Sequence, residues 1–241
     1  MPYRRTPTTD VSRLKVLKLA YEKAALLNFK DLPFSAETLR NLQNILLKFE
    51  QLYNLKKQNK LNKVQKNKEL QKIFKKIKLY IIHYFKVINF GIQRGELPKH
   101  IRTFYKLDPE NFNLPIIKNA KDVEHWVNTI IKGEKERYLK TNKILTTFPS
   151  IPSIKIVFDE FQKTYQQYIA SKKNYEHYAN KINEMREFID KFIVSLWNEI
   201  ENNFKNLDIE EKRKMASLFG VVYVKRNKEK QNSKNCITDE I

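Results

Sequence analysis

The segment ELQKIFKKIKLYIIHYFKVINF, residues 69–90, places apolar side chains three or four positions apart. This spacing gathers them on one face of an α-helix, so the segment predicts a helix that is buried along one side. Neither glycine nor proline occurs in residues 35–90 or 153–219, and the whole chain holds only 4 glycines and 8 prolines. Strand-rich folds need turn residues far more often. The sequence therefore predicts an all-α protein built around two long helical spans.

The same apolar pattern returns in KINEMREFIDKFIVSLWNEI, residues 181–200, after a shift of 112 positions. The register holds without a gap from residue 49 to residue 88, and large aromatic residues meet aromatic residues at several places. The matched pairs are Phe49–Phe161, Tyr53–Tyr165, Leu70–Ile182, Ile73–Met185, Ile77–Ile189, Tyr80–Phe192, Ile81–Ile193, Phe85–Trp197 and Ile88–Ile200. Such long agreement predicts an internal duplication.

The repeat extends beyond the long spans. Upstream, residues 8–27 match residues 118–137, and each stretch opens with a residue that commonly caps a helix, Thr9 or Asp10 in one and Asn119 in the other. Downstream, IRTFYKL (101–107) matches MASLFGV (215–221), which aligns Tyr105 with Phe219 and Lys106 with Gly220. Each copy is thus expected to hold a short helix, a long helical span and a short third helix that ends in an aromatic residue.

These boundaries predict a first helical repeat over residues 1–108, a linker over 109–118 and a second repeat over 119–224. The two repeats are expected to pack as one domain. The segment that follows Gly220 begins with the β-type run VVYV, so a short extended tail is expected, either docked as a strand or covering the end of the bundle. Residues 225–241 are expected to form a flexible basic tail.

Each long span fits either one continuous helix or a helical hairpin. A continuous helix over residues 36–92 would be about 85 Å long. Its middle, residues 56–69 (KKQNKLNKVQKNKE), is its most polar part, and the equivalent residues 170–181 are also polar. A polar middle suits the exposed tip of a hairpin, so we expect two hairpins that form a tandem-duplicated helical bundle. The expected turn sites are Asn59, Asn62 or Asn67, and Asn174 or Asn180.

The chain carries a net charge of +20, which favours anionic partners such as nucleic acid. Residues 1–118 hold 25 basic and 9 acidic residues, whereas residues 119–241 hold 22 and 18. The excess therefore lies in the first half of the chain. Lysine far outnumbers arginine, and the chain is rich in Asn and Ile, so a genome biased towards A and T would produce part of this composition without selection for function.

The strongest basic cluster lies in the lysine-rich part of the first long span, from Lys56 to Lys76. It predicts binding to nucleic-acid backbones without recognition of sequence. The alternative is a solvated, lysine-rich helical end. Two further basic patches lie at the ends of the chain. The candidate residues are Lys56, Lys57, Lys60, Lys63, Lys66, Lys68, Lys72, Lys75, Lys76, Arg4, Arg5, Lys225 and Arg226.

A second hypothesis is a protein–protein scaffold or adaptor. Tyrosine rings suit interfaces because one end is apolar and the other is polar. Four tyrosines of the second copy lie close together in sequence and are the candidate partner-binding residues, although packing between helices would explain them equally: Tyr165, Tyr168, Tyr175 and Tyr178.

Catalysis is not expected. The chain has no Gly-rich phosphate loop and no nucleophile motif, and no two of its four histidines share a metal-ligand spacing, so neither a cofactor nor a metal is expected. A remote alternative is a ribonuclease that uses Arg94 and His100, because an Arg-x5-His pair is compatible with the short motif of a class of helical ribonucleases.

No stretch is apolar enough to span a bilayer, so membrane insertion is not expected. The single cysteine, Cys236, excludes an internal disulfide and favours a reduced, cytoplasmic location. The oligomeric state is left open by the sequence.

Three segments carry a resemblance to a known family: SLFGVVYVKR (217–226), LWNEIENNF (196–204) and YRRTPTTDVSRLKVL (3–17). The chain resembles a family of uncharacterised bacterial proteins that are all-helical and carry an aromatic-Gly-Val-Val-Tyr segment near the C-terminus. The resemblance would cover most of the chain. It implies an all-helical fold and no particular activity. The first copy departs from the aromatic-Gly pattern, because Lys106 stands where the second copy has Gly220.

Overall fold

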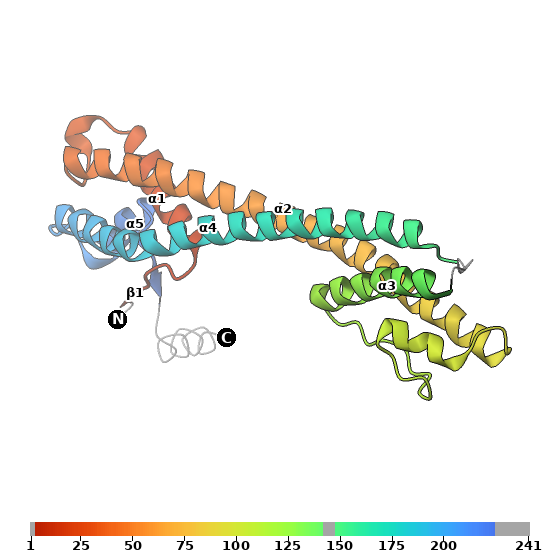
Figure 1. Ribbon diagram of the computed structural model, residues 1–241. Helices are drawn as coiled ribbons and strands as arrows, with labels where there is room; N and C mark the ends of the chain where they lie inside the picture. The colour runs from red at the N-terminus through yellow and green to blue at the C-terminus, as the bar shows by residue number, and fades with distance from the viewer. Residues whose placement is uncertain (1–2, 142–147, 225–241) are drawn as a thin grey trace, which may run out of the picture. The chain divides into compact units, whose positions relative to one another are not determined.

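The computed structural model describes residues 3–141 and 148–224. Its main elements, shown in Figure 1, are α1 (Asp10–Ala25), α2 (Ala36–Gln93), α3 (Ala120–Thr141), α4 (Ile151–Asn203) and α5 (Ile209–Leu218). Two 3₁₀ helices, η1 (Phe29–Asp31) and η2 (Lys99–Tyr105), join them, and β1 (Tyr3–Arg4) pairs antiparallel with β2 (Tyr223–Val224). The predicted all-α fold class is confirmed. The expected extended segment after Gly220 is the strand β2.

The expected hairpins are wrong, because each long span is a single helix. Helix α2 has 58 residues and α4 has 53. The polar residues 56–69 are helical throughout, and the Asn59 side chain donates a hydrogen bond to the Leu55 carbonyl 2.8 Å away, one turn back in the same helix. Lysine, glutamine and leucine are strong helix formers, and one asparagine costs only about 0.7 kcal/mol relative to alanine. A polar stretch without glycine or proline therefore has no reason to turn.

The chain divides into two compact units, and both long helices contribute to each. Unit 1 comprises Met1–Asn59 and Tyr175–Ile241, and unit 2 comprises Lys60–Asn174. The divisions fall within the polar stretches that were expected to form hairpin tips. The predicted repeats 1–108 and 119–224 therefore do not coincide with the compact units, because each repeat contributes residues to both.

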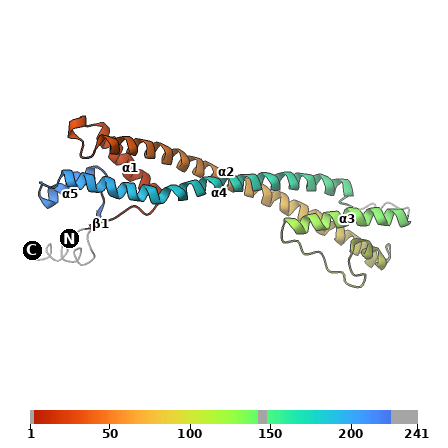
Figure 2. The same cartoon turned by 60° about the vertical axis from the view of Figure 1, so that its left-hand side comes forward.

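The core of unit 1 is formed by α1, the first part of α2, the last part of α4 and α5. Leu17, Leu42, Phe49 and Trp197 are completely buried there. In Figures 1 and 2, the red α1 lies beside the start of α2 and the end of α4, and these two parts of the long helices run antiparallel. Burying each large apolar side chain contributes roughly 1.5–3 kcal/mol. Most of the stability of a helix in a protein comes from tertiary packing, so this core holds α1 in place.

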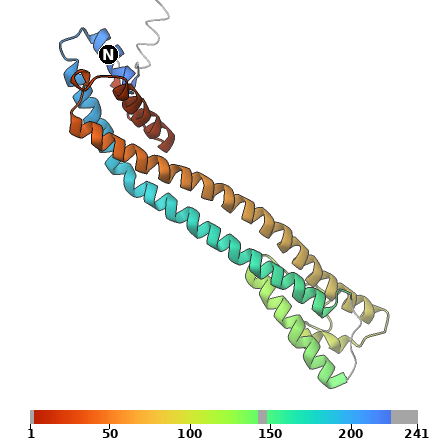
Figure 3. The ribbon, with the colours of Figure 1, turned by 90° about the horizontal axis from the view of Figure 1, so that it is seen from above.

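The core of unit 2 is formed by the last part of α2, the first part of α4, η2 and α3. Ile77, Ile81, Val127 and Ile154 are completely buried. Figure 3 shows the green α3 alongside the start of α4 in this unit. None of the helices in the described part of the chain contains an apolar run long enough to cross a membrane.

The two units bury equivalent positions of the predicted repeats. Each contains the short first helix of one copy, the first part of that copy's long helix, and the end of the other copy's long helix with its third helix. Six of the pairs matched in sequence are buried on both sides, with exposures of at most 3%: Phe49–Phe161, Ile77–Ile189, Ile81–Ile193, Phe85–Trp197, Ile88–Ile200 and Tyr105–Phe219.

Local geometry follows the same correspondence. Thr9 and Ser12 form a reciprocal capping box at the start of α1, and Asn119 and Asp122 form one at the start of α3. Lys106 has φ 55° and Gly220 has φ 87°, so both third helices end in a left-handed residue. The amides of the two residues donate to the carbonyls of Thr103 and Ser217, which are also equivalent. The duplication itself stays a prediction, and this geometry is what a duplication would produce.

Candidate functional site

The lysines of the predicted nucleic-acid interface lie along α2, and most of them are exposed. Leu70, Ile73 and Ile77 turn one face of the helix into the core of unit 2. The lysines that occupy other faces are exposed because apolar neighbours do not cover them. We define the lysine face as the exposed lysines of α2 between residues 60 and 78, all of which belong to unit 2: Lys60, Lys68, Lys72, Lys75, Lys76 and Lys78.

Three candidate lysines differ from this pattern, because Lys56, Lys63 and Lys66 are half-buried. The ammonium group of Lys56 lies 3.0 Å from the Asp10 carboxylate, and that of Lys66 lies 2.7 Å from Glu69. Lys56 therefore belongs to an ion pair with a buried carboxylate, whereas Lys66 pairs with a neighbour on the surface of the same helix. Lys57 is exposed and belongs to unit 1.

The lysine face itself is largely free of carboxylates. Lys76 forms a long ion pair of 3.5 Å with Glu160, and both side chains are about half exposed. Such surface pairs contribute at most about 1 kcal/mol. Within residues 3–141 and 148–224, the other five lysines of the face make no ion pair. Their charges are therefore directed to solvent.

Of the two basic patches near the chain ends, only the N-terminal one lies within the described residues. The Arg4 side chain donates a hydrogen bond to Asn198 at 2.8 Å and lies 3.6 Å from Glu201, so it fastens β1 to α4. Arg5 is exposed. Lys225 and Arg226 lie outside the described residues.

The four candidate tyrosines are divided between the two units. Tyr165 and Tyr168 are half-buried against the core of unit 2, and Tyr165 stacks on Phe161 with ring centroids 6.0 Å apart. Tyr175 and Tyr178 are half-buried and belong to unit 1. The rings of Tyr165 and Tyr168 thus serve helix packing, and an adaptor function that uses these tyrosines stays a prediction.

Arg94 and His100 have separate surroundings. The Arg94 guanidinium makes two hydrogen bonds of 2.6 Å to the Glu96 carboxylate at the exposed end of α2. The imidazole of His100 is exposed on η2. An arginine paired with its own neighbouring carboxylate is a poor phosphate ligand, and a ribonuclease function stays a prediction.

An ionic cluster in unit 1 is one feature that sequence reasoning missed. The Asp10 carboxylate, at the start of α1, accepts hydrogen bonds from Arg186 at 2.8 and 2.9 Å and from Lys56 at 3.0 Å. Arg13 lies 3.5 Å from Asp10 and makes two hydrogen bonds to Asp190. The hydrogen bonds from Arg186 lower the pKa of Asp10 from 3.8 to about 2; burial opposes this effect and Lys56 adds to it.

A second polar cluster lies inside unit 2. The Glu134 carboxylate accepts hydrogen bonds from the hydroxyls of Tyr84 and Tyr105 at 2.5 and 2.7 Å, and from Arg137 at 2.8 Å. Burial acts to raise the pKa of Glu134, but the hydrogen bonds from Arg137 and the two tyrosines outweigh it and lower the pKa. Burial raises the pKa of both tyrosines, so their hydroxyls remain proton donors. The cluster joins α2, η2 and α3 through these hydrogen bonds.

Arg102 is completely buried and organises the predicted linker. Its guanidinium donates to the carbonyls of Asp108 at 2.8 Å and Asn111 at 2.6 Å, and also to the Asn89 side chain. It lies over the Phe112 ring, 5.4 Å from the centroid. The linker that separates the predicted repeats is therefore bound to α2 and η2 through one cation.

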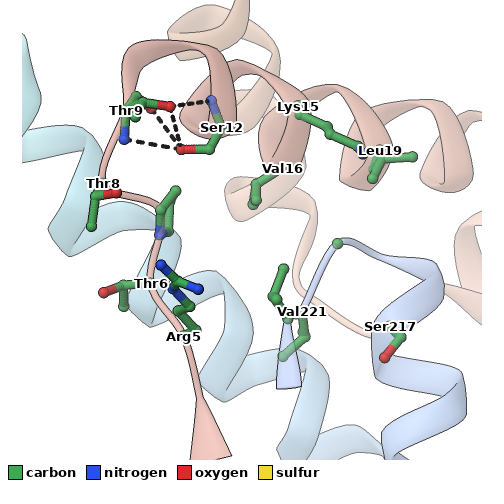
Figure 4. Close-up of a pocket in the computed structure, with 13 residues that line it drawn as sticks. Arg5, Thr6, Thr8, Thr9, Ser12, Lys15, Val16, Leu19, Ser217 and Val221 are labelled. Carbon is green, nitrogen blue, oxygen red and sulfur yellow. Dashed lines mark hydrogen bonds between the residues drawn. The ribbon is translucent and has the colours of Figure 1, made fainter. Parts of the chain in front are cut away.

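Two grooves lie at equivalent places in the two units. The α1–α5 groove of unit 1, shown in Figure 4, has a volume of about 470 Å³. It is lined by residues 5–9, Ser12, Lys15, Val16, Leu19, Ser217 and residues 220–222. The α3–η2 groove of unit 2 has a volume of about 850 Å³ and is lined by Thr103, Phe104, Lys106, Lys121, Glu124, His125, Asn128, Thr129, Lys132 and Glu136. Sequence reasoning missed both grooves, because residues far apart in the chain form them.

No protein-family model, curated protein or solved structure matches the chain. In the described residues, no three His, Cys, Asp or Glu side chains are grouped so that they could hold a metal ion.

Proposed function

We propose that the protein binds the phosphate backbone of nucleic acids through the lysine face of α2, without recognition of sequence. One observation supports this most: five lysines of that face are exposed and make no ion pair with a described residue. An unpaired ammonium group needs no internal contact to be broken before it meets a phosphate. Lysine also acts as a point charge and suits phosphate better than base edges.

The length of the face suits a nucleic-acid strand. Lys60 and Lys78 are 18 residues apart on one helix, which is about 27 Å at 1.5 Å per residue. A strand of B-form DNA carries one phosphate per 3.4 Å of axis, so this length covers about eight phosphates. The chain has no arginine in residues 41–93. The bidentate contacts by which arginine reads guanine are therefore not expected at this surface.

The test replaces three of the unpaired lysines together: Lys68→Ala, Lys72→Ala and Lys75→Ala. Binding of fluorescent single-stranded and duplex oligonucleotides is measured by anisotropy over a range of salt concentrations. Each lost phosphate contact lowers the slope of log K against log[salt] by about 0.9 on duplex and about 0.7 on single strands. We expect the triple variant to reduce the steepness of log K against log[salt] by about 2 to 3. The reduction should be the same for oligonucleotides of unrelated sequence.

The matched control is the triple variant Lys121→Ala, Lys132→Ala and Lys135→Ala, which removes the same charge from exposed positions of α3. It should lower the slope much less. Equal effects of the two variants would mean that net charge alone holds the nucleic acid, and the proposal would fail. Binding of the unmodified protein that does not weaken with salt would also exclude it.

A further inference from the structure

The two grooves share a position in the fold but differ in charge. The α1–α5 groove has two cationic side chains in its lining, Arg5 and Lys15, and no carboxylate. The α3–η2 groove combines three lysines with the carboxylates of Glu124 and Glu136. A cation next to a carboxylate is partly neutralised, so the second groove is a weak anion site. The first groove is a concave surface of uniform positive charge, which attracts anions.

The cations of the α1–α5 groove are available to a ligand. Arg5 and Lys15 are exposed, and no hydrogen bond or ion pair of the described residues involves their side chains. The same holds for the hydroxyls of Thr6 and Thr8. Figure 4 shows Arg5 and Thr6 on the segment that leads into α1, and Lys15 on α1 itself. Four donor side chains from two elements therefore line the groove without an internal partner.

The other hydroxyls of the groove already have internal partners. Thr9 and Ser12 satisfy each other in the cap of α1, with the Ser12 amide donating to the Thr9 hydroxyl at 3.1 Å. Ser217 donates to the Arg213 carbonyl at 2.7 Å. The start of α1 therefore supplies little to an anion, and recognition depends on the four unengaged side chains.

The opposite part of the groove is apolar. Val16, Leu19, Val221 and Val222 line it, and Gly220 allows the close approach of α1, because a Cβ there would lie 3.0 Å from the Val16 carbonyl oxygen. A volume of about 470 Å³ falls within the range of pockets that hold small organic ligands. Inorganic phosphate would use the cations and leave the apolar wall uncovered.

We propose that the α1–α5 groove binds a small organic phosphate: a phosphomonoester whose charged group contacts Arg5 and Lys15, and whose apolar or aromatic body packs on the exposed side chains of Leu19 and Val222. A nucleoside monophosphate has this chemistry and a suitable size. The site is separate from the lysine face, so it does not depend on the proposed binding of nucleic acid.

The experiment is a calorimetric titration of the full chain with AMP at low salt, in parallel with adenosine and inorganic phosphate. AMP should bind, and adenosine and phosphate should each bind at least tenfold more weakly. Arg5→Ala and Lys15→Ala should each weaken AMP binding about tenfold, as expected when a charge-assisted hydrogen bond is lost. Lys132→Ala, which removes one charge from the α3–η2 groove, should leave AMP binding unchanged. Circular dichroism checks that each variant is folded.

Three results would overturn the proposal: no AMP binding at millimolar concentration, equal weakening by Lys132→Ala, or phosphate that binds as tightly as AMP. The triple variant of the lysine face should bind AMP normally. Loss of AMP binding in that variant would also contradict a separate groove site. Nucleic-acid binding is measured independently, so either proposal can fail while the other stands.

Discussion

At the scale of single residues, the two short helices η2 and α5 are followed by different residues that share a left-handed backbone conformation. Lys106 and Gly220 both have positive φ, but only glycine adopts this region without steric cost. A lysine in the left-handed region costs roughly 1–2 kcal/mol. Lys106 is exposed, so its side chain gains little from packing to offset that cost.

Lys106→Gly should therefore stabilise the protein. Glycine removes the backbone strain, but it also stabilises the unfolded chain by increasing its conformational entropy. The first effect is larger, so the free energy of unfolding should rise by about 0.5–1 kcal/mol. Urea unfolding measures it. The reciprocal variant Gly220→Ala should destabilise, because a Cβ there would lie 3.0 Å from the Val16 carbonyl oxygen at a φ of 87°. A loss of stability in Lys106→Gly would show that the lysine makes a contact that outweighs its backbone strain.

At the scale of elements, the short helices are held by close backbone approach as well as by apolar packing. A Cβ at position 133 of α3 would lie 2.6 Å from the Phe104 carbonyl oxygen and 2.6 Å from the Tyr105 ring. The oxygen belongs to the backbone, and the ring is fixed by its hydrogen bond to Glu134. Glycine at this position allows α3 to contact η2 directly.

Gly133→Ala should consequently destabilise unit 2. Overpacking costs about 1–3 kcal/mol, and the better helix propensity of alanine returns up to about 1 kcal/mol, so a net loss of about 1–2 kcal/mol is expected. Urea unfolding provides the measurement. Lys132→Ala, at the adjacent exposed position of α3, is the control and should change stability by less than about 0.5 kcal/mol. A Gly133→Ala variant as stable as its parent would contradict the close approach of α3 and η2.

At the scale of the whole molecule, two units with separate cores use different polar chemistry. Unit 1 contains the ionic cluster around Asp10, whereas unit 2 contains the cluster of Glu134 with two tyrosines. The folded-state pKa of Asp10, about 2, lies below its ordinary value of 3.8. The stabilisation from this group is therefore present above pH 3.8 and is lost as the pH falls from 3.8 towards 2.

Asp10→Asn should destabilise the protein at pH 7 by about 2 kcal/mol. This is less than the 3–5 kcal/mol for a fully buried pair, because Lys56 and Arg186 are partly exposed. The difference between the variant and its parent should shrink as the pH approaches 2. In the variant, amide hydrogen exchange should become faster than in the parent protein, and the increase should be larger in α1 than in α3. The control Glu187→Gln breaks an exposed pair with Lys191 and should have little effect at any pH. A difference that is constant with pH would show that Asp10 does not stabilise the fold as a carboxylate.

The sequence by itself determined the helical class, the buried faces and several helix ends. Apolar spacing in residues 69–90 identified Ile77, Ile81 and Phe85 as core residues, and each of the three is at most 1% exposed. Asn119 was expected to cap the first helix of the second repeat, and its side chain accepts a hydrogen bond from the Asp122 amide at 3.1 Å. These features depend on residues within a few turns of each other, and such local patterns are legible in one sequence.

Tertiary structure alone decided which parts of the long helices share a core, and which charges remain available. The polar middle of α2 suggested a turn, but polarity does not break a helix when no glycine or proline is present. Asp10, Lys56 and Arg186 lie far apart in the chain, so their ion pairs, which engage the charge of Lys56 inside unit 1, could not be read from spacing. The α1–α5 groove has the same origin, since Arg5, Lys15 and Val221 line one space only after the chain has folded.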